Sequence, residues 1–408
     1  MRVRHRIDIT GSTPAPVDHS ACGEAEEITR AFSEGSGVNY CKYTGAYSAE
    51  WYWAKILHGI RADSRVREMA YTWVEHCDWM VGSLTGNTKP ETMYHSACAA
   101  GYKALWNREQ KGKRIMELQR FMERTAPIGI LGVKITQSGV DVAKHLWDDE
   151  CRRNVYSVSK SFTSTAVGIA VREGLLALEE KLVDAFAEDM PGQPNEYLKQ
   201  ATVRDLLTMC LGQENPELMG SQRPLYQEED WVKMSLAFPF TCQPGTKFVY
   251  NNVGPYLAGI LVQRRAGCDL VSYLTPRLFK PMGISRPTWE TDAQGNTFGA
   301  GGLFLTLSEM HKLGLLYLQD GLWNGKRLIP EEWVRESTRK QVSTDRETDY
   351  GYGYLFWGGP HGSFRADGKY AQFSIILRDK DAVISVVSEC REAKQLLDAV
   401  FEELYPQL

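Results

Sequence analysis

Apolar residues between positions 46 and 106 recur every three or four places, as they do on the buried face of a helix. The positions that carry this pattern are Trp51, Trp53, Ile56, Leu57, Met69, Trp73, Val74 and Cys77. After Trp106 comes a polar run, Asn-Arg-Glu-Gln-Lys-Gly-Lys-Arg, which has the composition of a linker. We therefore expect a helix-rich segment over residues 1–110 and a separate domain over residues 111–408.

Residues 111–408 combine segments that have the apolar period of a helix with segments that have the alternating period of a strand. The predicted elements are a helix over about 114–125, strands over 128–135 and 140–147, a helical middle, further strands within 351–388 and an amphipathic helix over about 391–404. This order indicates an α+β fold, in which an antiparallel sheet is flanked by amino- and carboxy-terminal helices and an α-helical lobe is inserted between strands. We expect the active site in a cleft between sheet and lobe.

Composition and charge exclude several classes of protein. Hydrophobic residues make up 43% and charged residues 24% of the 408 positions, which is typical of a globular protein. The 47 basic and 51 acidic residues nearly balance, and the short basic cluster of Lys111, Lys113 and Arg114 is typical of a solvated helix face. We expect no nucleic-acid partner.

The chain carries no pattern for export or for a metal. Its basic start is followed by Ile-Asp-Ile-Thr-Gly-Ser rather than by an apolar stretch, and no window resembles a membrane span of about 18 apolar residues. The nine cysteines form no Cys-x-x-Cys pair, and the eight histidines form no ligand pattern. These observations favour a cytoplasmic protein that binds neither membranes nor cofactors.

The most informative stretch is Tyr156-Ser157-Val158-Ser159-Lys160, which opens an apolar helical run ending near Gly174. Ser157 and Lys160 lie three residues apart and therefore share one face of a helix. A serine needs a nearby base to attack a carbonyl, and a lysine can be that base only when burial or positive charge favours its neutral amine. We predict that Ser157 is the nucleophile, with its backbone N–H as an oxyanion donor.

The bare Ser-x-x-Lys spacing is a weak signal, because Ser337-Thr338-Arg339-Lys340 has it too. That second copy lies in a polar segment without an apolar helix behind it. We therefore look for partners of Ser157, and Tyr250-Asn251-Asn252 follows a Pro-Gly turn. A phenol at Tyr250 could carry the proton to the leaving group, and the Asn252 amide could orient the lysine. The alternative is that Tyr250 is a core aromatic.

Taken together, Ser157-x-x-Lys160 and Tyr250-x-Asn252, followed by a glycine motif near the end, resemble the serine β-lactamase and penicillin-binding-protein superfamily in its class C-like branch. The resemblance covers about residues 112–405. It implies catalysis by Ser157, Lys160, Tyr250 and Asn252. It leaves open whether Lys160 or Tyr250 is the general base.

The third motif departs from the superfamily pattern. Where other members have Lys or His, then Thr or Ser, then Gly, this chain reads Ala366-Asp367-Gly368. The resemblance assigns the second oxyanion donor to the backbone N–H of Lys369. In penicillin-recognising members the missing cation holds the carboxylate of the drug. The neighbouring Arg365 is a doubtful substitute, because adjacent side chains on a strand point to opposite faces.

We therefore expect a small-molecule ester or amide as substrate, as for the esterases, amidases and peptidases of the superfamily, with at most weak β-lactamase activity. Leu211-Gly212, where many relatives have Ser-Gly, suggests an altered pocket. The alternative is a catalytically silent binding protein that retains the hydrolase fold.

Residues 1–110 resemble part of an L-ribulokinase-like member of the FGGY sugar kinases. The matching stretches are residues 8–14, 43–48, 73–79 and 98–106, the last reading Cys-Ala-Ala-Gly-Tyr-Lys-Ala-Leu-Trp. The segment has neither the phosphate-binding hairpin nor the ATP lobe of that family, so we expect no kinase activity. Apolar edges left without their sheet partners could instead pair two chains in a homo-oligomer.

Overall fold

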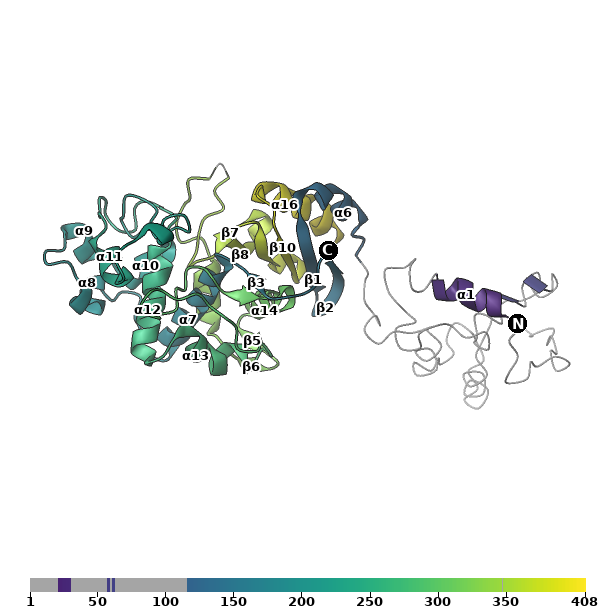
Figure 1. Cartoon of the computed structure of the whole chain (residues 1–408), viewed down its shortest axis with the longest axis horizontal. Coiled ribbons are helices and arrows are strands. Elements are labelled where there is room, and N and C mark those ends of the chain that lie inside the picture. Colours follow the sequence, from purple (N-terminus) through teal and green to yellow (C-terminus); the bar gives the residue numbers. More distant parts are fainter. Residues whose placement is uncertain (1–20, 31–56, 59–60, 63–115, 347) are drawn as a thin grey trace. The chain divides into compact units, whose positions relative to one another are not determined.

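The computed structural model describes residues 21–30, 57–58, 61–62 and 116–408, except residue 347 (Figure 1). The chain divides into two compact units, Met1–Lys113 and Arg114–Leu408. In the first unit, α1 (Cys22–Arg30) is a helix, and residues 57–58 and 61–62 are helical. The rest of the helical pattern predicted over 46–106 lies outside the described residues.

The second unit is built on a six-stranded antiparallel sheet with the order β2-β1-β10-β9-β8-β7 (Figure 1). Its strands are β1 (Ile130–Gln137), β2 (Val140–Leu146), β7 (Trp357–Gly358), β8 (Phe364–Gly368), β9 (Gln372–Leu377) and β10 (Ala382–Ser388). Two short ribbons, β3 (Arg153–Asn154) with β4 (Phe304–Leu305) and β5 (Leu322–Trp323) with β6 (Lys326–Arg327), lie outside it. The first strand of this unit, β1, therefore pairs with its last strand, β10, inside the sheet.

Both faces of the sheet are apolar and both are covered. On one face Ile135 lies opposite Ile384 and packs into a cluster with Phe121 and Leu396. Residues of the other face, such as Val383, join the larger core beneath the helical lobe. Side chains alternate along a strand, so a sheet buried on both sides needs nearly continuous apolar strands, and β10 is buried at every position.

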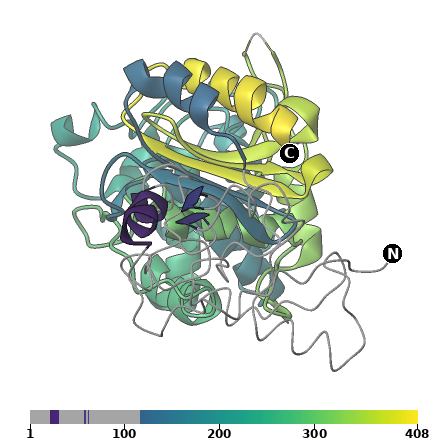
Figure 2. The same cartoon turned by 90° about the vertical axis from the view of Figure 1, so that its right-hand side faces the viewer.

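Helices from the two ends of the unit cover the first face. These are α6 (Gln119–Thr125) and α16 (Ala393–Ala399), the latter continued by a π-helical turn over Val400–Leu404 (Figure 2). The first strand begins two residues later than predicted, because Ala126–Ile128 form a 3-10 turn that ends at Gly129 with φ 73°. A left-handed glycine ends such a turn without steric cost.

The remaining helices form the lobe and the layer beneath the other face. They are α7 (Val158–Arg172), α8 (Leu182–Ala185), α9 (Glu196–Gln200), α10 (Val203–Thr208), α11 (Trp231–Ala237), α12 (Val253–Ala266), α13 (Leu270–Leu274), α14 (Leu307–Leu318) and α15 (Glu331–Thr338). α7 packs against α12, and α14 packs against β9 and β10. The predicted α+β architecture is confirmed, with the helical lobe inserted between β2 and β7.

Candidate active site

Ser157 lies at the amino end of α7, where the chain passes from the surface into the core. The residue before it, Tyr156, has a left-handed backbone (φ 49°), and its N–H donates to the Asn154 Oδ1 at 2.8 Å. Every side chain from Val158 to Ala170 is buried, whereas Ser157 is half-buried. The Ser157 hydroxyl is therefore presented at the boundary between solvent and the core.

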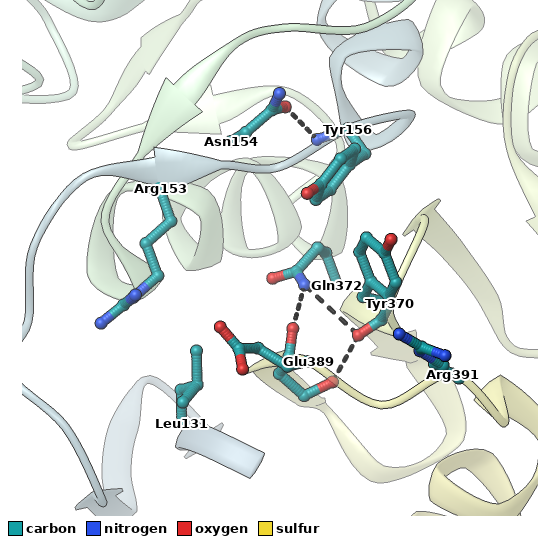
Figure 3. Close-up of a pocket in the computed structure, with 9 residues that line it drawn as sticks. Leu131, Arg153, Asn154, Tyr156, Tyr370, Gln372, Glu389 and Arg391 are labelled. Atoms are coloured by element: carbon teal, nitrogen blue, oxygen red, sulfur yellow. Dashed lines mark hydrogen bonds between the residues drawn. The ribbon is translucent and has the colours of Figure 1, made fainter. Parts of the chain in front are cut away.

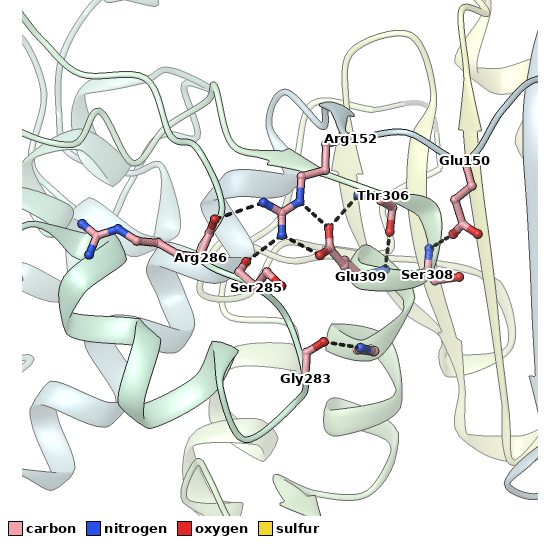
Figure 4. Close-up of polar contacts among 9 residues, drawn as sticks. Glu150, Arg152, Gly283, Ser285, Arg286, Thr306, Ser308 and Glu309 are labelled. Carbon is pink, nitrogen blue, oxygen red and sulfur yellow. Dashed lines mark hydrogen bonds and ion pairs between the residues drawn. The ribbon is translucent and has the colours of Figure 1, made fainter.

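The segment that leads to Ser157 is held by Arg152 (Figure 4). Its guanidinium donates to the Glu309 carboxylate at 3.0 and 2.7 Å and to the backbone carbonyls of Ser285 and Arg286 at 2.6 and 3.0 Å. Glu309 also accepts from the Thr306 N–H at the start of α14. Arg152 thus connects the segment before Ser157 to α14 and to the backbone at residues 285–286.

Lys160 is the centre of the site. Its side chain is 1% exposed, and its Nζ lies 2.8 Å from the Ser157 Oγ, 2.7 Å from the Asn252 Oδ1 and 2.7 Å from the Ala300 carbonyl oxygen. The predicted serine and lysine are brought into direct contact, and Asn252 joins them from 92 residues away in the sequence.

Burial lowers the pKa of Lys160 to about 7, and the positive charge of Arg223 acts in the same direction, while Asp367 opposes both. A neutral amine has two N–H donors and one lone pair. The Asn252 Oδ1 and the Ala300 carbonyl can only accept, so they take both N–H groups. The lone pair is then left for the Ser157 hydroxyl, which is the arrangement of a general base and its nucleophile.

The orientation of the Asn252 amide is set from its other end. Its Nδ2 donates to the Leu218 carbonyl at 2.8 Å, and the side chain is 8% exposed. A carbonyl cannot donate, so the amide nitrogen must face Leu218 and the oxygen must face Lys160. Asn252 lies at the amino end of α12, which is buried over Val253–Gln263 and gives the residue a rigid support.

Tyr250 lies on the other side of the nucleophile. Its hydroxyl interacts with the Ser157 side chain, and its ring centroid is 5.2 Å from the Lys160 Nζ. The ring stacks on Trp357 with centroids 5.5 Å apart. Burial raises the pKa of Tyr250 well above its ordinary value, so the phenol keeps its proton at neutral pH. It can relay a proton but is a poor base.

The third motif lies on β8 and the turn after it. Gly368 closely approaches the segment leading to Ser157, since a Cβ on it would lie 2.3 Å from the Val155 carbonyl oxygen. Lys369 directly follows this contact. The turn continues through Tyr370 and Ala371, both in the left-handed region with φ of 61° and 59°. Glycine at 368 is therefore a steric requirement of the site.

The side chains before Gly368 supply no free cation on this strand. Ala366 is 1% exposed and belongs to the core. Arg365 is 5% exposed, and it donates to the Asp367 carboxylate at 3.0 Å and to the Gly358 carbonyl at 2.9 Å. Arg365 and Asp367 share a face, as alternate residues on a strand do.

Several groups at the site were missed by the sequence analysis. The Ala300 carbonyl is a backbone atom, and only the glycine run at 299, 301 and 302 hints at unusual backbone there. Arg223, which pairs with Glu290 at 3.0 Å, begins a 3-10 turn over Arg223–Leu225 that carries no recognised motif. The guanidinium of Arg346 lies 3.7 Å from the centroid of Trp357, the ring on which Tyr250 stacks.

The second Ser-x-x-Lys copy does not assemble a site. Ser337 is fully buried in α15, and its hydroxyl donates to the Val334 carbonyl at 3.3 Å within the same helix. Lys340 lies beyond the end of that helix and pairs with Asp349 at 2.7 Å. Serine and lysine therefore have separate partners here.

Leu211 does not line a substrate pocket, contrary to what the sequence suggested. It is 1% exposed and packs in the main core. Gly212 has φ 91°, and a Cβ on it would lie 2.5 Å from the Cys242 carbonyl oxygen. Leu211 therefore serves core packing and Gly212 allows a close approach of two backbone segments, and neither serves substrate contact.

Within the described ranges, no group of three or more His, Cys, Asp or Glu side chains could hold a metal ion. The same residues include no helix that is long and apolar enough to cross a membrane.

Comparison with known proteins agrees with this geometry. A sequence profile described as Beta-lactamase matches residues 132–401. The chain belongs to the beta-lactamase family. This family consists of serine hydrolases of the β-lactamase type. One relative, the 6-aminohexanoate-dimer hydrolase of Paenarthrobacter ureafaciens, is 21% identical over 263 residues, which cover 62% of this chain and 66% of the relative.

The fold and the amino-terminal segment each have a further match. The solved structure of EstCE1, a hydrolase with promiscuous acyltransferase activity, superposes with a TM-score of 0.57 at 15% identity over 70% of this chain and 97% of the other. The amino-terminal part is similar to the ribulokinase of Vibrio parahaemolyticus, 31% identical over 147 residues. That match spans 30% of this chain and only a quarter of the ribulokinase, 25%.

Proposed function

We propose that this chain is a serine hydrolase that cleaves a small-molecule ester or amide through an acyl-enzyme formed on Ser157. The observation that carries the proposal is the donor and acceptor arrangement around Lys160. Two acceptors take its N–H groups, which leaves its lone pair for the Ser157 Oγ, 2.8 Å from the Lys160 Nζ. This favours Lys160, rather than the high-pKa Tyr250, as the general base.

In the proposed reaction, the Ser157 oxygen bonds to the substrate carbonyl carbon as its proton passes to the Lys160 amine. The backbone N–H groups of Ser157 and Lys369 hold the negative oxygen of the tetrahedral intermediate. The bond to the leaving group then breaks, and the proton returns from Lys160 through the Tyr250 hydroxyl to the leaving atom. Water repeats the sequence on the acyl-enzyme, which frees the acid and restores Ser157.

The third motif supports an ester or amide substrate over a penicillin-like one. Ala366 has no charge, and Arg365 is already bonded to Asp367 and to the Gly358 carbonyl. A carboxylate in the position used by β-lactams would find no free cation on β8. The named activities of the similar proteins, a 6-aminohexanoate-dimer hydrolase and a hydrolase with promiscuous acyltransferase activity, agree with this choice.

For the amino-terminal segment, we propose a role as a packing or interaction module without kinase activity, joined to the hydrolase near residue 110. Its relatives are much longer kinases, of which the chain spans a quarter or less.

The test measures hydrolysis of a short nitrophenyl ester and of a chromogenic cephalosporin by the full chain and by Ser157→Ala. We expect ester turnover to fall by roughly 10³-fold in this variant and the wild type to prefer the ester. The matched control is Ser337→Ala, which removes the serine of the second copy and should keep its rate. Equal ester rates for wild type and Ser157→Ala would favour a silent binding protein instead.

A further inference from the structure

A second concave site lies on the hydrolase unit, at the ends of β1, β9 and β10 (Figure 3). It is an open pocket of about 350 Å³. Its lining residues are Leu131, Arg153, Asn154, Tyr156, Tyr370, Gln372, Ser388, Glu389 and Arg391. The catalytic groups Ser157, Lys160 and Tyr250 are not among them, so the catalytic contacts described above leave this pocket unexplained.

Gln372 contributes an unpaired acceptor to this pocket. The residue is 3% exposed, and its Nε2 donates to the backbone carbonyls of Tyr370, at 3.3 Å, and Ser388, at 2.5 Å. Both carbonyls can only accept, so the amide cannot be turned round. Its Oε1 is buried and has no hydrogen-bond partner in the structure. A buried acceptor of this kind is costly unless a donor arrives to satisfy it.

A negatively charged side chain, Glu389, lines the same pocket. In Figure 3 the Glu389 carboxylate and the Gln372 Oε1 point toward the same part of the pocket. No ion pair to Glu389 occurs within residues 116–408 apart from residue 347. Of the two arginines that line the pocket, Arg153 is already paired with Asp148, and within the described residues Arg391 forms no ion pair with Glu389. This part of the pocket therefore suits a positively charged donor.

The pocket borders the groups proposed to hold the oxyanion. Tyr156 directly precedes Ser157 and Tyr370 directly follows Lys369. Their rings meet edge to face with centroids 5.3 Å apart, and both line the pocket. Two lining residues of the pocket are thus the sequence neighbours of the two proposed oxyanion donors.

We propose that this pocket binds an ammonium group of the substrate, with the Gln372 Oε1 and the Glu389 carboxylate accepting its N–H donors. The inference rests on the proposed hydrolase function and narrows its substrate class to esters or amides that carry an amine. Such a charge-assisted contact adds selectivity, because a neutral group would leave both acceptors unsatisfied.

The test uses 4-nitrophenyl esters of ω-amino acids with three to eight carbons, each beside an isostere in which a methyl group replaces the ammonium. We expect one chain length at which kcat/KM for the ammonium ester exceeds that of its isostere by roughly tenfold. Glu389→Gln should remove most of this preference. The matched control, Glu392→Gln, makes the same change at an exposed residue outside the pocket and should keep the preference.

These experiments distinguish failure of the ammonium-site inference from failure of the hydrolase proposal. Hydrolysis of neutral esters without an ammonium preference at any length, or equal losses in Glu389→Gln and Glu392→Gln, would overturn the inference and leave the hydrolase proposal standing. Failure to hydrolyse either type of ester would overturn both.

Discussion

The chain contains the Ser-x-x-Lys motif twice, from Ser157 to Lys160 at the start of α7 and from Ser337 to Lys340 at the end of α15. In the first copy the lysine is 1% exposed and touches the serine at 2.8 Å. In the second copy the serine is buried within its own helix, and the lysine forms a surface ion pair with Asp349. Spacing alone is thus insufficient, and what distinguishes α7 is burial of the lysine together with two acceptors that take its N–H groups.

The largest effect should come from the two lysines. Lys160→Met keeps the length and burial of the side chain but removes the base, so we expect kcat/KM on a nitrophenyl ester to fall by roughly 10³-fold. Lys340→Met loses only a surface ion pair and should stay within about twofold of wild type. Full activity in Lys160→Met would show that the motif on α7 is as silent as the one on α15.

The second prediction concerns Tyr250, the third group at the Ser157 site. Tyr250→Phe keeps the stack on Trp357 but removes the hydroxyl that interacts with Ser157. We expect a loss of roughly 10²-fold in kcat. Tyr350→Phe changes a 44% exposed tyrosine and serves as the matched control. A rate in Tyr250→Phe that equals the control would remove the proton relay from the proposed mechanism.

The two helices also touch, which gives a stability prediction. A Cβ on Gly168 of α7 would lie 2.4 Å from the ring of Trp333 on α15. Gly168→Ala should therefore lower the free energy of unfolding by about 1–3 kcal/mol, although alanine usually favours a helix. Gly192→Ala is the control, since a Cβ there meets nothing within 4 Å. Urea denaturation of the full chain checks both, and a more stable Gly168→Ala would show that the helices are not in close contact.

The smallest effect should come from Arg223, whose positive charge lowers the pKa of Lys160. Because the neutral amine is the base, kcat/KM should rise with pH through about 7. Arg223→Gln should move this rise to higher pH and reduce kcat/KM at pH 7 by about threefold. Arg335→Gln, an exposed arginine on α15, should leave the profile unchanged. A shift of the Arg223→Gln profile to lower pH would contradict the stated electrostatics.

Much of the fold and part of the site could be predicted from the sequence. Apolar periodicity indicated the sheet and its terminal helices, and the ordered motifs identified Ser157, Lys160, Tyr250 and Asn252, which the structure brings together. The Ala300 carbonyl could not be found this way, because a backbone acceptor leaves no side-chain signature. The ion pair between Arg365 and Asp367 could not be predicted either, because alternation along a strand gives a shared face but not a contact.

The most direct test of the central claim is the protonation state of Lys160 itself. Lysine labelled with ¹³C at Cε in the full chain allows each ammonium group to be titrated by NMR, and the Lys160→Met spectrum identifies the resonance. The account predicts one lysine resonance with a midpoint of about 7 that disappears in Lys160→Met. Titration of every lysine near its ordinary pKa of about 10.4 would contradict it.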